Sequence, residues 1–327
     1  MKKEFLFGIL FCVNIFIVCA DEPYVTKNFP SSSIKTVEAF TGSGSITITG
    51  DNVSEAIVEV YVWRDDWTDE KCKKAFEEHF ALNVDVNDNK LIAQVKPKKD
   101  NLNWKKQGVN ISFTITVPKQ VHSKLQSEGG DIKIANLIGS QDIKTENGSL
   151  NVENITGNVY GITKEGDIFV TKCFANIDVL TNDGNMTVKD NKGNIILKSS
   201  KGEISVNNCN GKVVLKTVNS NANLNNISGN IDAKSANGNL NIKMASVSEF
   251  IKISNYDNVN LTMPSGIGYN LNINADEIEV SGLENFVGRK DSKIIEGTVG
   301  EGGPEIEIVV LKESEKDKNR KLRLAIE

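Results

Sequence analysis

The sequence predicts an all-β protein organised around a β-solenoid with 18-residue coils. Residues 127–252 consist of seven copies of one 18-residue repeat, with no insertion or deletion. Each copy contains two short runs in which apolar residues alternate with polar ones, and Gly, Asn or Ser residues end each run. Alternation is the period of a β-strand, and a constant repeat of about 20 residues is typical of stacked coils.

Small residues mark the corners of the coil. Each copy opens with a hydroxyl residue: Ser127, Thr145, Thr163, Thr181, Ser199, Thr217 and Ser235. Three positions later the series reads Gly130, Gly148, Gly166, Gly184, Gly202, Ser220 and Gly238. Nine positions further on it reads Gly139, Gly157, Ala175, Gly193, Gly211, Gly229 and Val247. We expect glycine at corners because sharp bends often need a positive φ, which glycine adopts without steric cost.

Aligning the copies predicts the interior. The first inward series is Ile132, Leu150, Ile168, Met186, Ile204, Ala222 and Leu240. The second is Ile134, Val152, Val170, Val188, Val206, Leu224 and Ile242. A third, before the second corner, is Leu137, Ile155, Cys173, Asn191, Cys209, Ile227 and Ala245. Because a buried amide needs hydrogen-bond partners, we expect Asn191 to bond to the corner backbone.

Residues 21–126 precede the repeat and predict a β-rich N-terminal cap. Apolar residues alternate through several runs, and an amphipathic helix is expected over residues 68–80, with Cys72 and Phe76 on its apolar face. A hairpin over residues 82–95 turns at an Asn-Asp-Asn sequence. Such a segment would cover the open edge of the solenoid, which could otherwise recruit other chains.

Residues 253–327 predict a β-rich C-terminal cap. Alternating apolar pairs persist here, but the 18-residue frame is lost and glycine-rich loops separate the strands. The charged tract 313–321 is expected to form a hairpin turn, with residues 322–326 as its return strand.

Residues 1–20 predict a secretory signal peptide. Lys2 and Lys3 precede an apolar run, and small residues stand before a cleavage point ahead of Asp21. The run is too short for a preferred membrane span, and no later segment is apolar enough for one. A lipid anchor at Cys19 is the alternative, although Val18 stands where such signals favour smaller residues. The protein is therefore expected in the periplasm or at the cell surface.

Three cysteines follow this leader: Cys72, Cys173 and Cys209. The last two occupy the same position two coils apart, so their Cα atoms would be separated by about 9.6 Å at a coil spacing of about 4.8 Å. A disulfide requires less than about 7 Å. We expect free, buried thiols.

Composition and motifs argue against several functional classes. The net charge of −5 does not point to nucleic acid as a partner. His79 and His122 have no metal-ligand spacing, and the glycine-rich aspartate motif of calcium β-rolls occurs once, without repeating. No cofactor or metal is expected. Glycan-active enzymes on a β-helix need converging carboxylates in a cleft, usually built from long loops, and the seven copies carry no loop insertion. We therefore expect no catalysis.

Residues 113–118, residues 127–132 and the glycine-rich stretch 296–304 resemble a family of bacterial envelope proteins. Its members are called putative adhesins and include the auto-transporter head (GIN-type) domain. The resemblance implies a right-handed β-helix and export to the envelope. It supplies no catalytic residues. The adhesin function that it implies rests on the name of the family alone.

Two outward series are candidate contact sites. The last position of four successive copies gives Lys198, Lys216, Lys234 and Lys252, a basic stripe that is either a solvated face or a docking strip for an anionic glycan, polymer or lipid headgroup. The outward positions of the second strand also give an apolar contact patch: Tyr160, Ile162, Leu180, Ile196 and Val214. Contiguous apolar patches usually mark a contact, and either a terminal cap or a partner chain could cover this one.

Together these features predict an exported cell-envelope β-solenoid, acting as an adhesin-like surface interaction or structural module. The alternatives are a periplasmic binding or signalling partner and a glycan-active enzyme. A cell-surface glycan or another envelope protein is the expected partner, and the oligomeric state stays open.

Overall fold

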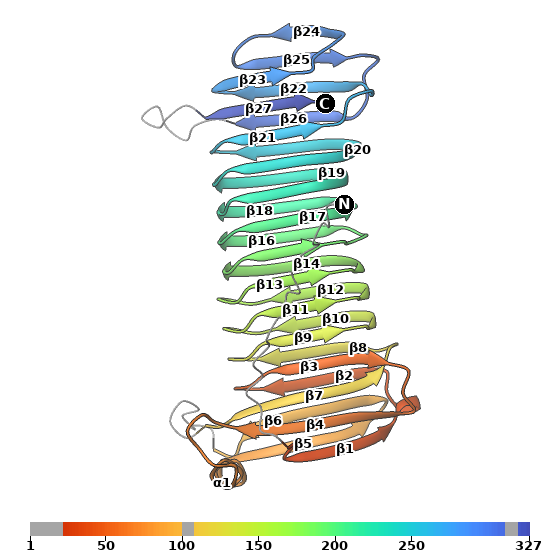
Figure 1. The fold of residues 1–327 in the computed structure, drawn as a ribbon, viewed down its shortest axis with the longest axis vertical. Helices are drawn as coiled ribbons and strands as arrows, with labels where there is room; N and C mark the ends of the chain where they lie inside the picture. The colour runs from red at the N-terminus through yellow and green to blue at the C-terminus, as the bar shows by residue number, and fades with distance from the viewer. Residues whose placement is uncertain (1–21, 100–107, 311–319) are drawn as a thin grey trace, which may run out of the picture.

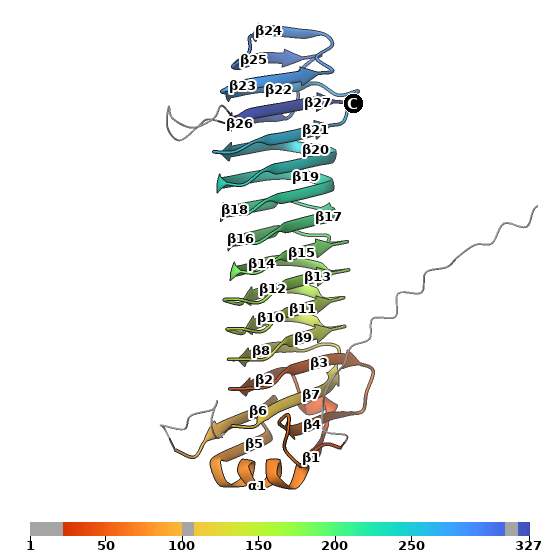
Figure 2. The same cartoon turned by 60° about the vertical axis from the view of Figure 1, so that its left-hand side comes forward.

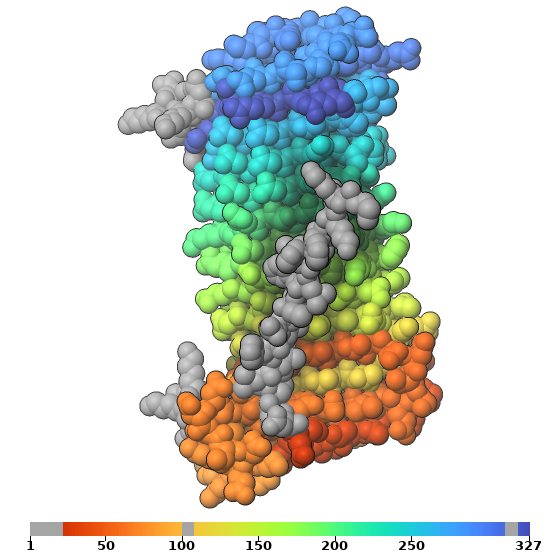
Figure 3. All heavy atoms as spheres, viewed as in Figure 1, coloured from red at the N-terminus to blue at the C-terminus, as the bar shows by residue number. Residues whose placement is uncertain are grey.

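The computed structural model describes residues 22–99, 108–310 and 320–327. Their strands join one 27-stranded sheet, which winds into an elongated solenoid (Figure 1). In the space-filling view the coils form one continuous body from the N-terminal to the C-terminal end (Figure 3). The all-β class and the 18-residue coil predicted from the sequence are confirmed.

Two parallel strand stacks form the coils. The first stack contains β9 (Ile132–Ala135), β11 (Leu150–Glu153), β13 (Ile168–Thr171), β15 (Met186–Lys189) and β17 (Ile204–Asn210). The second contains β8 (His122–Ser127), β10 (Ile138–Lys144), β12 (Thr156–Ile162), β14 (Phe174–Asp183), β16 (Ile195–Lys201) and β18 (Val213–Asn219). Two longer strands, β19 (Ala222–Asn237) and β20 (Leu240–Asn255), contribute to both stacks. From β9 to β19, each strand pairs in parallel with the equivalent strand of the next coil, as Leu150 does with Ile168.

The interior follows the predicted alternation. Every residue of the first two inward series is buried, including Val188, which is fully enclosed. Asn191 is also buried, and its Nδ2 donates to the carbonyl oxygens of Ala175 at 3.2 Å and Gly193 at 3.3 Å. The expected bond from this amide to the corner backbone is therefore confirmed.

Two constraints, positive φ and close approach between coils, favour glycine at the corners. At the second corner φ is positive, as in Gly157 at 135° and Gly211 at 142°. At the first corner a Cβ on Gly148 would lie 2.1 Å from the carbonyl oxygen of Gly130 one coil away, and Gly202 and Gly238 also have a positive φ there, of 107° and 114°. Before the second corner, one residue of each coil has a left-handed backbone conformation with positive φ: Asn136, Asn154, Lys172, Asp190, Asn208 and Asn226.

The seventh copy departs from the predicted frame. In β20, Val247 pairs with Gly229 but Ile251 pairs with Ile231, so two steps along β19 match four steps along β20. Met244 takes the buried place beside Ile227, whereas Ala245, predicted to point inward, is exposed. The expectation of seven copies without insertion is wrong here, because bulges in β20 absorb extra residues.

The N-terminal end extends the stacks before it closes them. Its strands are β1 (Val25–Pro30), β2 (Thr36–Thr41), β3 (Ile46–Asp51), β4 (Glu55–Trp63), β5 (Phe80–Asn87), β6 (Lys90–Pro97) and β7 (Asn110–Pro118), with a short 3-10 turn η1 (Ser31–Ser33). β2 and β3 pair in parallel with β8 and β9 and so add to the coils. The predicted helix is α1 (Asp69–His79), which begins after the capping residue Thr68 and lies across this end (Figure 2).

The C-terminal end interleaves its strands. They are β21 (Val259–Met263), β22 (Tyr269–Ala275), β23 (Glu277–Ser281), β24 (Phe286–Lys290), β25 (Ile294–Val299), β26 (Glu305–Val310) and β27 (Lys321–Ile326). β26 lies between β20 and β22, and β27 between β21 and β23. β27 is the predicted return strand, whereas most of the charged turn before it lies outside the described residues.

The expected signal peptide and Cys19 also lie outside the described residues. Within the described ranges, no helix is long and apolar enough to cross a membrane. The division of the chain at residues 126 and 252 stays a prediction.

Candidate binding groove

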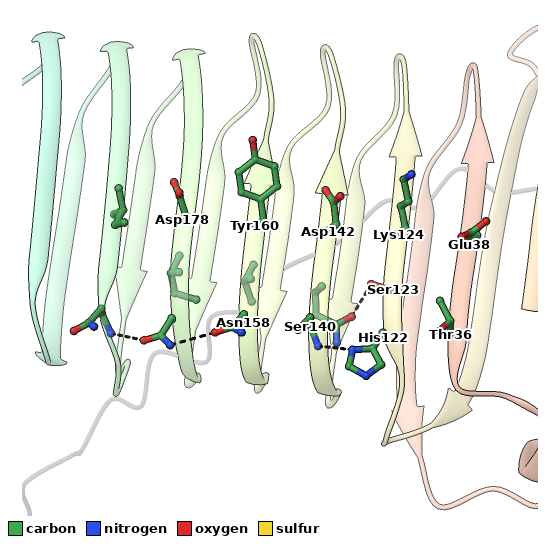
Figure 4. Close-up of a pocket in the computed structure, with 16 residues that line it drawn as sticks. Thr36, Glu38, His122, Ser123, Lys124, Ser140, Asp142, Asn158, Tyr160 and Asp178 are labelled. Atoms are coloured by element: carbon green, nitrogen blue, oxygen red, sulfur yellow. Dashed lines mark hydrogen bonds between the residues drawn. The ribbon is translucent and has the colours of Figure 1, made fainter. Parts of the chain in front are cut away.

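A groove of about 800 Å³ lies on the outer face of the second strand stack (Figure 4). Two outward rows line it, and each row takes one residue from each successive strand. The first row reads Glu38, Lys124, Asp142, Tyr160, Asp178 and Ile196. The second row reads Thr36, His122, Ser140, Asn158, Asn176 and Asn194. The groove therefore extends along the solenoid from β2 to β16.

The strand period explains why these side chains face outward. Val159 and Ile177 are buried in the core, and their neighbours along each strand must then point to the opposite face. Because the strands are in parallel register, the same position recurs on the next coil about 4.8 Å away. A row of polar groups along the axis is the direct result.

The three asparagines form a hydrogen-bonded ladder. Asn176 donates from Nδ2 to Oδ1 of Asn158 at 3.2 Å, and its own Oδ1 accepts from the backbone nitrogen of Asn194 at 3.1 Å. Oδ1 of Asn194 accepts in turn from the backbone nitrogen of Lys212 at 3.0 Å. These bonds fix the direction of each amide. Within the described residues, the NH₂ groups of Asn158 and Asn194 keep their donors free.

Tyr160 is the aromatic residue of the groove and is 42% exposed. It stands between Asp142 and Asp178 on neighbouring strands. The Lys144 Nζ lies 5.4 Å from its ring centroid, a cation–π distance. The remaining ring surface can contact a ligand.

Each carboxylate of the groove has a lysine beside it. Nζ of Lys198 lies 2.8 Å from Oδ1 of Asp178, and Nζ of Lys144 lies 3.5 Å from Oδ1 of Asp142. Glu38 is paired with Lys90 at 2.8 Å. Such exposed pairs contribute little to stability, but they balance the local charge.

The end of the groove nearest the N-terminal module rests on buried polar contacts. Ser123 donates to Oε1 of Gln141 at 2.6 Å, and Nε2 of Gln141 donates to the carbonyl oxygen of Val121 at 3.1 Å. Above them, Nδ1 of His122 accepts from the backbone nitrogen of Ser140 at 3.0 Å. Nε2, the other ring nitrogen of His122, has no hydrogen-bond partner within the described residues.

The basic stripe has three members in register rather than four. Lys198, Lys216 and Lys234 lie on consecutive strands. Lys252 was predicted to follow them, but it pairs with Asp232 instead, because the two extra residues in β20 shift the register. A carboxylate oxygen of Glu307 lies 3.3 Å from its Nζ. Whether the remaining three bind an anion stays a hypothesis.

The predicted apolar patch is distributed over two rows. Tyr160 and Ile196 line the groove, and Val214 follows Ile196 in the same row. Ile162 and Leu180 stand in the row that continues into Lys198. The terminal modules stack on the ends of the solenoid (Figure 1), and Tyr160 remains exposed, so cover by a terminal cap is not observed for this residue.

The sequence also predicts that Asn158, Asn176 and Asn194 bond along the stack, and the ladder confirms this, whereas sequence reasoning missed the acidic residues of the groove. Asp142 and Asp178 share the 18-residue spacing of Tyr160, a signal that could have placed all three in one row. Glu38 carries no such signal, because β2 joins the stack from outside the repeat. The described residues contain no group of three His, Cys, Asp or Glu side chains arranged to hold a metal ion.

Comparison with known proteins supports the family resemblance. Residues 163–311 match the Toastrack DUF4097 family, in agreement with the resemblance seen in the sequence. A search of curated proteins finds no match.

Solved structures give distant likenesses. A putative adhesin from Parabacteroides distasonis ATCC 8503 is 10% identical, with a TM-score of 0.42 over 93% of this chain and 98% of that chain. A putative adhesin from Bacteroides fragilis NCTC 9343 is 12% identical, with a TM-score of 0.33 over 92% and 96%. A putative lipid binding protein from Parabacteroides distasonis is 11% identical, with a TM-score of 0.32 over 94% and 98%. Identities this low transfer no function.

Proposed function

We propose that this chain, which matches the Toastrack DUF4097 family over residues 163–311, is an exported cell-envelope protein whose solenoid acts as an adhesin-like interaction module without catalysis. The observation that carries the proposal is the groove, in which an exposed tyrosine and two ordered polar rows extend over several coils. A rigid stack with an elongated contact face suits the binding of a surface polymer or of another envelope protein.

Export rests on residues 1–20, which have the charge, apolar run and small cleavage-site residues of a secretory leader. Fractionation of cells that express the full chain, followed by intact-mass measurement, tests this part. A mature chain that begins at Asp21 in the periplasm or at the surface supports export by cleavage. An acylated chain that begins at Cys19 supports the lipid anchor, and a cytosolic chain that retains Met1 contradicts both.

The absence of catalysis rests on the composition of the groove. Its three carboxylates are each paired with lysine, and the repeating coils carry no inserted loop that would close a cleft over them. Incubation of the protein with a glycan panel, followed by assay for new reducing or unsaturated ends, tests this point. Turnover that is lost in Asp142→Asn or Asp178→Asn would replace the proposed module by a glycan-active enzyme.

A further inference from the structure

We propose that the groove binds an extended, uncharged glycan along the solenoid axis, with Tyr160 as its stacking platform and the asparagine row as its hydrogen-bonding edge. This inference rests on the proposed function, because it names the ligand class of the same interaction module. It assigns the contact to one face and to named residues.

The repeat of the groove matches a polymer rather than a compact ligand. Asn158 and Asn176 stand on the neighbouring strands β12 and β14, and Asn194 comes immediately before β16, so that the three recur about 4.8 Å apart. A pyranose unit in an extended glycan has a similar length. Sugars bound along the axis would therefore meet equivalent amides on successive coils.

The side-chain chemistry suits sugar hydroxyls and C–H faces. An amide offers both donors and an acceptor, and the free NH₂ groups of Asn158 and Asn194 can donate to hydroxyl oxygens. The exposed ring of Tyr160 offers an apolar face with a polar tip. Ile196 adds a second apolar surface two coils further along the same row, beyond Asp178.

The charge of the groove favours an uncharged chain. The row of Tyr160 contains three carboxylates and one lysine, Lys124, so an anionic polymer would lie beside more carboxylates than cations of that row. A cationic polymer would have to displace lysines that already lie within 3.5 Å of each carboxylate. The groove therefore favours neither an anionic nor a cationic polymer.

An extended peptide fits the groove less well. β-strand addition requires an unpaired strand edge, whereas β12 is hydrogen-bonded on one side to β10 and on the other to β14. The backbone under Tyr160 is therefore already saturated. Recognition must come from side chains, and their amides are held in place by the ladder before any ligand arrives.

The test measures binding of the full mature chain by isothermal calorimetry. The probes are hexasaccharides of glucose, mannose and N-acetylglucosamine, an oligogalacturonide as the anionic probe, and a short uncharged peptide. We expect one or more uncharged hexasaccharides to bind, and the corresponding trisaccharide to bind more weakly because it spans fewer coils. Tyr160→Ala should lower the affinity by roughly tenfold or more, as expected for loss of a stacked aromatic contact, and Tyr160→Phe should retain most of it.

The first strand stack supplies matched controls. Phe169 is 38% exposed and lies outside the groove, so Phe169→Ala removes an exposed aromatic ring elsewhere. Asn223 accepts from Nδ2 of Asn241 at 2.8 Å, so Asn223→Ala breaks an equivalent ladder. Both controls should leave binding unchanged, whereas Asn158→Ala should weaken it, and thermal unfolding of each variant checks that it is folded.

Several outcomes would overturn the inference. Failure of every uncharged hexasaccharide, or a preference for the oligogalacturonide or the peptide, contradicts the ligand class. Glycan binding that survives Tyr160→Ala and Asn158→Ala contradicts the site while leaving the interaction module intact. A loss of export or the appearance of turnover contradicts the proposed function instead, so the two failures are distinguishable.

Discussion

The Thr163 hydroxyl donates a 2.8 Å hydrogen bond to the carbonyl oxygen of Gly148 in the preceding coil. Oγ1 of Thr163 also accepts from the backbone nitrogen of Gly166 at 3.1 Å. Thr145 makes the equivalent pair of bonds one coil earlier. In these coils the buried hydroxyl thus joins one coil to the next and closes its own corner. From Ser199 on the partners differ, because Ser199 donates to the carbonyl oxygen of Lys201 at 2.6 Å and Thr217 donates to Oγ of Ser235 at 2.8 Å.

Thr163→Val should therefore destabilise the solenoid although it preserves the shape of the side chain. It removes both bonds and leaves buried backbone groups without this partner, at a cost of about 1–3 kcal/mol. Urea unfolding measures the change in free energy, and Thr163→Ser serves as the control because it keeps the hydroxyl. Equal stability of the two variants would show that the hydroxyl is dispensable.

Val188→Asp tests the interior directly. Val188 is fully buried between Val170 and Val206 in the strand stack, so an unpaired carboxylate there would be desolvated. We expect a loss of several kcal/mol in the free energy of unfolding. A loss smaller than about 1 kcal/mol, within the range of surface substitutions, would contradict the inward placement.

The sequence predicted the interior well because alternation and an 18-residue period act together. Each inward position recurs in every copy, so one small side chain such as that of Ala222 does not hide the apolar series. The seventh copy could not be predicted in the same way. Met244 and Ala245 are both apolar and adjacent, and only the paired structure shows that β20 places Met244 inside.

The groove was harder to predict for a different reason. Tyr160, Ile196 and the asparagines lie within the repeat and could be placed on outward rows from the sequence. Glu38 belongs to β2, which pairs with β8 although most of the N-terminal module separates the two strands in the sequence. Long-range pairing of this kind leaves no periodic signal, so the place of Glu38 at the end of the groove emerges only from the fold.

The thiols are expected to be free but unreactive in the folded protein. Cys173 and Cys209 are buried and unpaired, and burial raises the pKa of both thiols above the ordinary value. Because the thiolate is the reactive form, alkylation by iodoacetamide at pH 8 should be slow in the native state. After denaturation without reductant both should react fully by mass spectrometry, whereas protection until reductant is added would reveal a disulfide and contradict the coil register.

Tyr269 should make the protein sensitive to alkaline pH. It is fully buried, its hydroxyl donates to the carbonyl oxygen of Pro264 at 2.6 Å, and burial raises its pKa to about 12. The unfolded chain loses this proton near pH 10, so it binds fewer protons than the folded chain above that pH, and stability falls as pH rises from 10 towards 12. Below pH 10 the protonated Tyr269 makes its full contribution to the free energy of unfolding.

Tyr269→Phe isolates this effect from other titrating groups. The variant should be less stable at pH 8, because it loses the hydrogen bond, but its stability should decline less between pH 9 and 11. Tyr256→Phe is the matched control, since Tyr256 is 44% exposed. Urea unfolding across this pH range measures both, and parallel pH profiles for native and Tyr269→Phe proteins would contradict the assignment.

The corrected register of the basic stripe gives a matched test of anion binding. Lys216 and Lys234 are exposed neighbours on adjacent strands, whereas Lys252 lies beside Asp232 and within 3.3 Å of Glu307. If the stripe binds anionic polymers, Lys216→Gln with Lys234→Gln should weaken oligogalacturonide binding several-fold at low salt, and added salt should abolish the difference because exposed charges are screened. Lys252→Gln removes the same kind of charge from a site already flanked by carboxylates, so its effect should be much smaller. The contrary outcome is that Lys252→Gln lowers the affinity by as much as each of the two substitutions in the double variant. Total charge, rather than the ordered stripe, would then govern binding.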